Sequence, residues 1–397
     1  MKVLVLAPQP FFEVRGTPLA VLALVRALTR LGHRVDLLTF PQGEGVTVPG
    51  LRHLRSLPLP VGRVKAGASM GKLLLDLPFM AEAAWRMATG RYDVVHAVEE
   101  AAHLAAPLAR LLQLPYVMDV DSSIPDQLRY SGFATHGPLL WLAERLDDHG
   151  LRHASAVVTI CTSLSEGVRR SAPDARVFQI EDPPLVDTKA PVSPDAVASL
   201  RSSLGLGPEP IVFYSGNFEP YQGVPLLLEA AAQLPGVQVV LMGGEPHEVE
   251  SLRARTEPSH AGARCVFTGK QPPSELPLFL ALADIVVSPR IRGENTPFKV
   301  YTYLASGKPL VATRLPTHTQ LLDDSLAFLA EPTPEALAGA LRAALADRDD
   351  AGGRAARGVA LIEREYSEAR YLEKVRAAYA HVEACVSQAR QSLRLVR

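Results

Sequence analysis

The chain has 397 residues, of which 47% are hydrophobic, and its formal net charge is -1. This length gives room for two domains of ordinary size, and the composition excludes a disordered chain and a general nucleic-acid binder. The three cysteines, Cys161, Cys265 and Cys385, lie far apart, which argues against a zinc site and favours a reducing, cytoplasmic setting. The first residues already form a strand-like run, and no apolar run reaches about 18 residues, so neither a signal peptide nor a membrane span is expected.

The first half of the chain alternates strand-like runs with helical patterns, which predicts a series of βαβ units with a parallel sheet. Helical periodicity covers 19–31 and 101–112. The strand-like runs are Val3 to Ala7, Val35 to Thr39, Val94 to Ala97, Tyr116 to Val120 and Val157 to Ile160.

Residues 1–91 contain twelve Lys and Arg against five Asp and Glu, a net charge of +7. Basic residues from Arg52 to Lys72, including Arg63 and Lys65, alternate there with leucines. Such a mixture is typical of a surface that contacts anionic membranes, and it is equally consistent with a solvated helix face over an ordinary core.

A Pro-rich segment from Glu181 to Pro194 separates the first series from a second one. We therefore expect one doubly wound domain at 1–185, a second doubly wound domain at 186–372, and a C-terminal helix at 373–397 that packs back on the first domain. The strand-like runs of the second series are Ile211 to Tyr214, Val237 to Met242, Ala263 to Thr268, Ile285 to Ser288 and Pro309 to Ala312.

Two loops of the first domain contain candidate site residues. Gly16 precedes the helical segment at 19–31, so the amides there are candidates to meet a phosphate or a hydroxyl. Asp119, Asp121 and Ser122 lie at and just after the end of the strand Tyr116 to Val120, and they are candidates to hold sugar hydroxyls. The alternatives are that Gly16 only provides turn geometry and that the aspartates cap a helix.

Loops after two strands of the second domain are rich in glycine and polar residues. Gly216, Asn217 and Gln222 follow the first of these strands, and Gly244 follows the second. Because carboxyl ends of parallel strands share one edge of a sheet, these residues are expected to contribute to one site. Turn geometry alone is again the alternative for the glycines.

The segment from Ser288 to Thr313 is the most informative part of the chain. Its pattern predicts a strand, a loop, a helix from Pro297 to Ser306 and a second strand. Unpaired amides at such a helix start favour an anion, and ionic side chains surround it. The candidates are Arg290, Glu294, Asn295, Thr296, Pro297 and Lys299.

These motifs resemble those of the family 4 glycosyltransferases, which have the GT-B fold. The opening strand with Leu31-Gly32-His33-Arg34-Val35, the Asp93-Val94-Val95-His96 strand, and the Gly216 to Val224 stretch each resemble the family's equivalents. The stretch from Glu294 to Ala312 is similar to its donor-site signature. The resemblance covers nearly the whole chain and implies two doubly wound domains facing a central cleft.

The chain departs from the family pattern at four positions. The family signature has a pair of glutamates; Glu294 matches the one at the donor sugar, whereas Thr302 stands at the one that commonly meets the nucleotide ribose. Asn217 and Gln222 stand where members tend to have a basic pair for the diphosphate. Lys299 and Arg290 are the nearest replacements in sequence, and a surface lysine is the alternative for Lys299. Asp121 stands near the position of a common family histidine, and its carboxylate would accept sugar hydrogen bonds.

The resemblance implies a retaining transferase that moves a hexose-type sugar from a nucleotide-diphosphate sugar to an acceptor hydroxyl. Glu294, Asp121 and Lys299 are the expected catalytic residues, and neither a cofactor nor a metal is expected. The acceptor would be a lipid-linked molecule or a polysaccharide, and the protein would lie in the cytoplasm or at the inner face of the membrane. The alternatives are a sugar-nucleotide-binding or scaffold protein with weakened catalysis, and a GT-B nucleotide-sugar epimerase.

Overall fold

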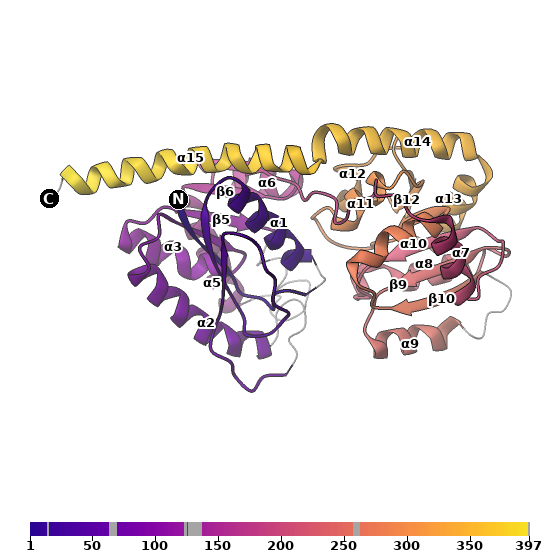
Figure 1. Ribbon diagram of the computed structural model, residues 1–397, viewed down its shortest axis with the longest axis horizontal. Coiled ribbons are helices and arrows are strands. Elements are labelled where there is room, and N and C mark those ends of the chain that lie inside the picture. The colour runs from indigo at the N-terminus through magenta and orange to yellow at the C-terminus, as the bar shows by residue number, and fades with distance from the viewer. Residues whose placement is uncertain (14–15, 63–69, 123–124, 126–136, 257–262, 396–397) are drawn as a thin grey trace. The chain divides into compact units, whose positions relative to one another are not determined.

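The computed structural model describes the chain apart from residues 14–15, 63–69, 123–124, 126–136, 257–262 and 396–397, which include Arg63 and Lys65. The described chain forms two compact units (Figure 1). The first comprises Met1–Asp182 with Ala369–Arg397, and the second comprises Pro183–Glu368. The first unit thus contains two stretches of chain that are far apart in sequence.

The first unit contains a parallel sheet of seven strands in the order β3-β2-β1-β4-β5-β6-β7. The central strands are almost wholly buried, because helices cover both faces of the sheet. The strands are β1 (Lys2–Ala7), β2 (Arg34–Thr39), β3 (Leu51–Arg55), β4 (Val94–Val98), β5 (Tyr116–Val120), β6 (Ala156–Thr159) and β7 (Val177–Gln179).

Two sets of helices cover this sheet. Side chains of α1 (Gly16–Arg30) and α15 (Glu368–Leu395) share one hydrophobic cluster. Side chains of α2 (Met70–Thr89), α3 (Ala101–Leu112), α5 (Pro138–His153) and α6 (Thr162–Ser171) share the other. Tyr371, Val375, Tyr379 and Val382 anchor α15, which runs along the first unit (Figure 1). This helix begins earlier than the sequence pattern predicts, at Glu368 rather than 373.

The second unit contains a parallel sheet of six strands in the order β10-β9-β8-β11-β12-β13. Its inner strands read as continuous apolar runs, such as Ile211-Val212-Phe213 and Ile285-Val286-Val287, because both faces are buried. The strands are β8 (Ile211–Ser215), β9 (Gln238–Met242), β10 (Arg264–Gly269), β11 (Ile285–Ser288), β12 (Leu310–Thr313) and β13 (Phe328–Ala330).

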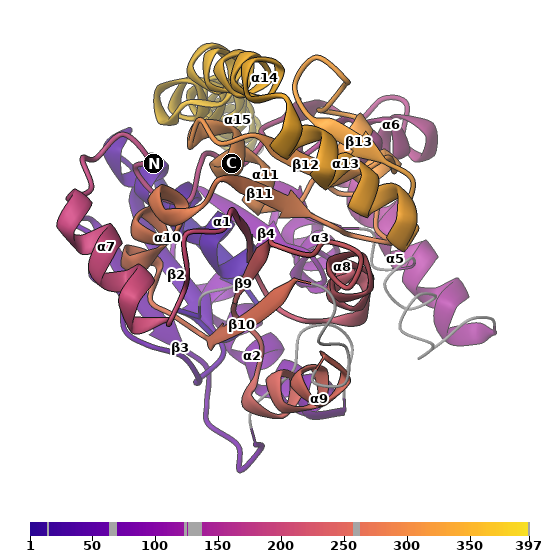
Figure 2. The same ribbon diagram turned by 90° about the vertical axis from the view of Figure 1, so that its right-hand side faces the viewer.

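The helices of the second unit pack on its sheet and form two further hydrophobic cores with it. Side chains of α8 (Val224–Ala231), α9 (Pro246–Thr256), α13 (Pro334–Ala346) and α14 (Arg348–Leu361) join one core. Side chains of α7 (Pro194–Ser203), α10 (Leu276–Leu282) and α11 (Phe298–Ala305) join the other. Figure 2 shows α11, β11, β12, β13 and α13 in this unit. The short segments η1 (Pro220–Gln222) and α12 (Pro316–Thr319) lie in loops after strands.

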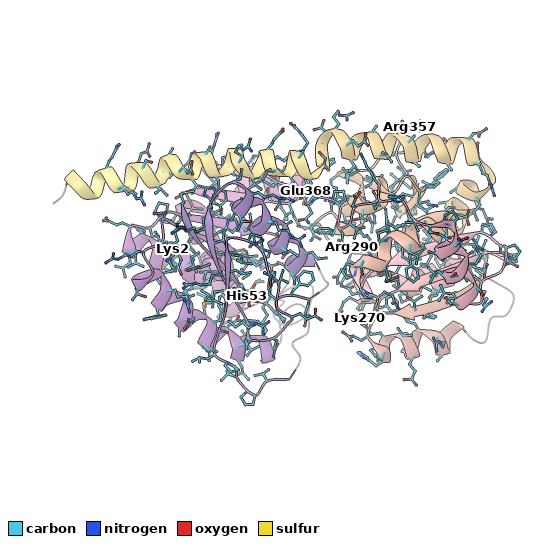
Figure 3. All side chains as sticks on the ribbon, viewed as in Figure 1. Lys2, His53, Lys270, Arg290, Arg357 and Glu368 are labelled. Carbon is cyan, nitrogen blue, oxygen red and sulfur yellow. The ribbon has the colours of Figure 1, made fainter. Side chains whose placement is uncertain are left out.

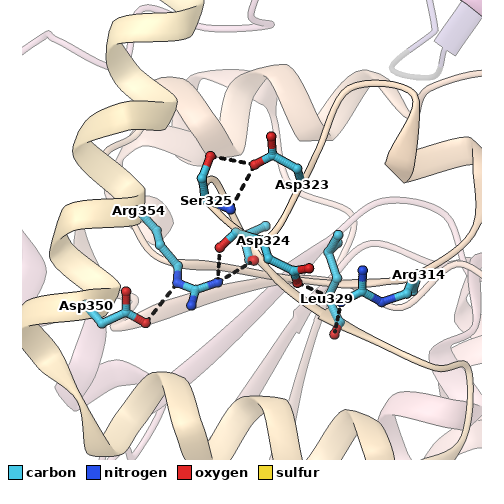
Figure 4. A network of polar contacts seen from close by, with 8 residues as sticks. Arg314, Asp323, Asp324, Ser325, Leu329, Asp350 and Arg354 are labelled. Carbon is cyan, nitrogen blue, oxygen red and sulfur yellow. Dashed lines mark hydrogen bonds and ion pairs between the residues drawn. The ribbon is translucent and has the colours of Figure 1, made fainter.

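A polar network ties α14 to the loop before β13 (Figure 4). Arg354 donates from Nε to Asp350 Oδ2 over 2.9 Å and from Nη1 to the carbonyl of Ala327 over 2.9 Å. Arg314, which follows β12, reaches Asp324 Oδ1 at 2.6 Å. The chain on either side of α12 is therefore tied to the body of the second unit.

The structure corrects two details of the expected elements. The helix after Glu294 begins at Phe298, and Pro297 precedes it in an extended conformation. Strands β3, β7 and β13 were not predicted. β7 and β13 have only three residues each, and β3 reads Leu-Arg-His-Leu-Arg at a sheet edge, so short length or mixed polarity weakens their local signals.

Candidate functional site

The donor-side candidates surround the point where the strand order of the second sheet reverses. Strands β8 and β11 are neighbours, while the chain connections leave them toward opposite edges. In open α/β sheets such a point leaves space for a ligand beyond the carboxyl ends of the strands. The loops at this point are 216–223, after β8, and 289–297, after β11.

Glycines allow these loops to approach one another closely. A Cβ atom at Gly223 would lie 1.8 Å from the carbonyl oxygen of Pro289, and one at Gly243 would lie 1.9 Å from the carbonyl oxygen of Gly216. Both glycines also have positive φ angles, 73° and 127°. The backbone N–H of Ile291 donates to Tyr221 O over 2.9 Å. These contacts join the two loops into one structure.

Lys299, on the first turn of α11, places its ammonium group against the loop after β8. Its Nζ donates to Gln222 Oε1 over 3.1 Å, lies 3.9 Å from the centre of the Tyr214 ring, and would lie 2.7 Å from a Cβ at Gly216. Burial, and secondarily the charge of Arg290, lowers the pKa of Lys299 well below its ordinary value. Within the described residues no carboxylate pairs with this ammonium group, so an anionic ligand would stabilise it.

Arg290, labelled in Figure 3, serves the loop itself. Its Nε donates to Arg292 O over 2.8 Å, and its Nη1 and Nη2 donate to Asn295 O and Asn295 Oδ1 over 3.0 and 2.9 Å. The residue is 7% exposed. The guanidinium of Arg290 is thus engaged by oxygens of its own loop and shapes it, while its role as a phosphate ligand stays a prediction.

In the segment from Glu294 to Thr296, the carbonyl groups and the N–H groups point in opposite directions. The carbonyl oxygens of Glu294 and Asn295 accept hydrogen bonds from Gln320 Nε2 at 2.7 Å and Thr317 Oγ1 at 2.6 Å. In a trans peptide, the following N–H points opposite to the carbonyl. The N–H groups of Asn295 and Thr296 therefore point away from α12. Within the described chain, the N–H of Thr296 has no hydrogen-bond acceptor, and Glu294 itself is exposed.

The remaining donor-side candidates divide into two groups. Asn217 is exposed, and its carbonyl accepts the Tyr214 hydroxyl over 2.7 Å. Gly244 packs against the ring of Phe218, to which a Cβ would approach within 2.3 Å. Asn217 and Gly244 lie on the loops after β8 and β9, and Pro297 immediately precedes α11.

The side chain of Thr302 faces Leu185 and not the other donor-side candidates. It is 1% exposed, and its Oγ1 accepts the backbone N–H of Leu185 over 2.9 Å. The structure thus gives Thr302 a packing role between α11 and the segment that enters the second unit.

The first unit holds a second group of candidates, around Asp121. Asp119, Asp121 and Asp182 line a cavity of about 20 Å³ together with Ala20 of α1 and Tyr371 of α15. That volume is sufficient for a water molecule. Gly16 is exposed at the first position of α1, the helix whose Ala20 reaches the cavity.

Burial and neighbouring carboxylates change the ionisation of Asp121 and Asp182. Burial raises the pKa of Asp121 well above its ordinary value, and Asp119, Glu99 and Asp182 raise it further. Burial likewise raises the pKa of Asp182 to about 8. Both effects favour the protonated form of Asp121. In that form the carboxyl group donates a hydrogen bond as well as accepting one, and its contact with sugar hydroxyls stays a prediction.

Sequence reasoning missed a hydrogen-bond chain behind this cavity. His96, which is fully buried on β4, lies 2.8 Å from Asp119 Oδ2 through Nε2 and 2.9 Å from the Tyr379 hydroxyl through Nδ1. Because the carboxylate only accepts, we assign the ring proton to Nε2 and the Tyr379 hydroxyl as donor to Nδ1. The signal available in the sequence was a polar residue, His96, inside an otherwise apolar strand. Its partner Tyr379 comes from a distant helix and could not be inferred.

Within the described part of the chain, no three His, Cys, Asp or Glu side chains are placed to hold a metal ion. The same residues contain no helix that is both long and apolar enough to cross a membrane.

Two family models match successive parts of the chain. Residues 15–181 match the glycosyl transferase 4-like domain, and residues 198–357 match the glycosyl transferases group 1 domain. The chain belongs to the family 4 glycosyltransferases. Both domains of this family 4 chain have the parallel-sheet architecture that the GT-B fold requires.

Three relatives illustrate the range of similarity. A GDP-mannose-dependent alpha-(1-6)-phosphatidylinositol monomannoside mannosyltransferase from Mycolicibacterium smegmatis is 35% identical over 33% of this chain and 37% of its own length. An alpha-D-kanosaminyltransferase from Streptomyces kanamyceticus is 27% identical over 57% of this chain and 61% of its own. The structure of Anabaena HepE in complex with UDP and glucose superposes with a TM-score of 0.74 at 18% identity, covering 96% of this chain and 99% of that one. The family 4 chain thus aligns with less than two thirds of the length of the two curated relatives.

Proposed function

We propose that the protein transfers a hexose-type sugar from a nucleotide-diphosphate sugar to an acceptor hydroxyl, with retention of the anomeric configuration. The observation that carries the proposal is Lys299, a half-buried residue whose ammonium group has no carboxylate partner in the described chain. In the loop that precedes it along the chain, the N–H groups of Asn295 and Thr296 point away from α12. An ammonium group in this position is costly in an empty protein, and a diphosphate would remove that cost.

The names of relatives support this donor class. One relative is named as GDP-mannose-dependent, and the structural neighbour HepE was solved with UDP and glucose. Both descriptions contain a nucleoside diphosphate and a hexose. We propose that the second unit binds that part of the donor, with Lys299 and the amides of Asn295 and Thr296 at the diphosphate and the exposed carboxylate of Glu294 at sugar hydroxyls.

In the proposed reaction, the bond between the anomeric carbon and the diphosphate oxygen breaks, and a bond from that carbon to the acceptor oxygen forms. The acceptor proton passes to the leaving phosphate oxygen, so the balance needs no side-chain base. Negative charge accumulates on the diphosphate during bond cleavage, and Lys299 with the loop amides would stabilise it. Since these groups supply positive charge, we propose a reaction without a metal or a cofactor.

On the first unit, we propose that Asp121 serves the acceptor or the transferred sugar as a neutral acid. Its raised pKa gives it one O–H donor beside its acceptor oxygen. This chemistry resembles that of a neutral imidazole, which also donates and accepts, and it would compensate for the missing family histidine. Gly16 at the start of α1 would add backbone contacts.

A membrane-near, lipid-linked acceptor is the finer part of the proposal. Of the eleven large hydrophobic side chains that are exposed in the described chain, ten belong to the first unit. They include Leu73, Leu74, Leu77 and Trp85 on α2 and Trp141 on α5. Exposed tryptophans and leucines near basic residues fit the surface of an anionic bilayer. We therefore propose a cytoplasmic protein that contacts the inner face of the membrane, with a polysaccharide as the alternative acceptor.

The test is a panel of UDP- and GDP-linked hexoses, first by calorimetry and then by release of nucleoside diphosphate with and without vesicle-borne acceptors. The proposal predicts binding of one donor and slow hydrolysis that accelerates with an acceptor. The absence of binding to every nucleotide sugar in the panel would refute it.

A sugar-nucleotide-binding protein without turnover is the second candidate, and one observation favours it. The hydroxyl of Thr302 is buried and accepts a hydrogen bond from the N–H of Leu185, at the position where the family commonly has a ribose-binding glutamate. Tight donor binding without any release of nucleoside diphosphate, with or without acceptors, would favour this candidate over the transferase.

A further inference from the structure

The short helix α12 and the residue after it form hydrogen bonds to loop 289–297, the proposed phosphate loop. Thr317 is fully buried, and its Oγ1 donates to Asn295 O over 2.6 Å while it accepts from Arg290 Nη1 over 3.3 Å. Gln320, just after α12, donates from Nε2 to Glu294 O over 2.7 Å. Two consecutive carbonyl groups of the loop are thus held by side chains from one segment.

This arrangement determines which way the loop amides point. Because each peptide is planar and trans, holding the carbonyls of Glu294 and Asn295 toward α12 turns the N–H groups of Asn295 and Thr296 to the opposite side. Arg290 also donates to Asn295 O and Asn295 Oδ1, so Thr317 and Gln320 act together with Arg290 in fixing the orientation of this loop. The direction of the amides therefore depends on residues that themselves face away from a ligand.

His318 makes α12 a rigid support. Its Nδ1 donates to Thr313 O over 2.8 Å, and its Nε2 accepts from Ser288 Oγ at 2.8 Å, which links α12 to the ends of β12 and β11. Burial lowers the pKa of His318 to about 3, so the ring remains neutral over the physiological pH range. The hydrogen bonds that hold Thr317 in place therefore do not change with pH in that range.

We infer that Thr317 and Gln320 are positioning residues for the transfer reaction: they orient the amides of Asn295 and Thr296 toward the anionic part of the donor without touching it. The inference rests on the proposed function, because it concerns the same phosphate loop. Neither side chain was a sequence candidate, since both lie after the following strand.

The variants that test this inference remove one hydrogen-bond donor at nearly constant volume. Thr317→Val removes the hydroxyl, and Thr317→Ser restores it. Gln320→Met removes the amide donor at a half-buried position, where misfolding is a smaller risk. Thr319→Val is the matched control, because this exposed neighbour bonds only to Leu315 O of its own helix among the described residues.

The measurements are the dissociation constants of a nucleoside diphosphate and of the corresponding nucleoside, the donor KM and kcat, and the melting temperature. Thr317→Val and Gln320→Met should each weaken diphosphate binding by roughly two- to tenfold, which corresponds to one hydrogen bond. Nucleoside binding should remain unchanged, Thr317→Ser should recover wild-type binding, and Thr319→Val should match the wild type.

Two results would overturn the inference, and they differ. If both variants melt at lower temperature but bind the diphosphate as tightly as the wild type, Thr317 and Gln320 only support the fold. If nucleoside and diphosphate affinities fall equally, the effect is not directed at the amides. A wild-type protein that binds no nucleotide sugar would instead refute the proposed function, and the inference with it.

Discussion

The two candidate regions bury charge of opposite sign. In the second unit, Lys299 is half-buried against Gln222 and Tyr214, and burial lowers the pKa of its ammonium group. In the first unit, Asp121 and Asp182 are buried around a small cavity, and their pKa values are raised for the same reason. Each group is thus driven toward its neutral form. The difference leads to opposite proposals for the two regions: an anion beside Lys299, and hydrogen-bonding hydroxyls beside Asp121.

The largest expected effect concerns Glu294, which is exposed and therefore separable from stability. Glu294→Ala should lower the rate of sugar transfer by at least about a hundredfold, because it removes a contact that orients the donor in the transition state. The melting temperature should stay at the wild-type value. Glu250→Ala, at another exposed position of the same unit, is the control. Undiminished turnover in the Glu294 variant would remove this residue from the mechanism.

Lys299→Met should affect binding and stability in opposite directions. Loss of the ammonium should weaken nucleoside diphosphate binding by more than roughly tenfold. The ligand-free protein should become more stable, since the variant removes a buried charge whose pKa is depressed. Lys189→Met, at an exposed lysine that pairs with Glu363, is the control. Parallel losses of binding and stability would show that Lys299 is a structural lysine.

Asp182→Asn probes the acidic cavity through pH. Because the pKa of Asp182 is raised to about 8 from 3.8, the folded state binds more protons than the unfolded state between these values, so its contribution to stability falls as pH rises through that window. The asparagine variant should therefore gain stability relative to the wild type, on the order of 1 kcal/mol or more near neutral pH. Melting curves from acidic to alkaline pH measure this, and a constant difference across pH would contradict it.

The exposed apolar residues of the first unit provide a fourth test. Replacing Leu77 and Trp85 of α2 by serine should weaken binding to anionic vesicles by several fold, because less apolar surface enters the interface. Ile291→Ser, which changes an exposed apolar residue of the second unit, should have no effect. Equal vesicle binding by the three proteins would argue for a polysaccharide acceptor.

The smallest effect is expected at Tyr379, whose hydroxyl is hydrogen-bonded to His96. Tyr379→Phe should cost about 1 kcal/mol of unfolding free energy, the typical value of one buried hydrogen bond. Denaturant unfolding measures this. A much larger loss would mean that the chain from Tyr379 through His96 to Asp119 acts as a unit.

The sequence predicts the parallel strands and the loops after them because buried strands and glycine-rich turns have local signatures. It places Lys299 beside the β8 loop, since both follow neighbouring strands. It does not predict the direction of a side chain. Arg290 turns inward to its own loop, and Thr302 faces Leu185, because these choices depend on oxygens and amides that are remote in sequence. The sequence does not predict the pairing of His96 with Tyr379 for the same reason, since the two residues are remote in sequence.

The most direct test of the central claim is proton uptake by Lys299 when a nucleoside diphosphate binds. Calorimetric titrations at mildly alkaline pH, in buffers of different ionisation enthalpy, count the protons that bind with the ligand. Because an anion would restore the depressed pKa of Lys299, the wild type should take up protons, and Lys299→Met should not. Equal proton counts in the two proteins would contradict a diphosphate site at Lys299.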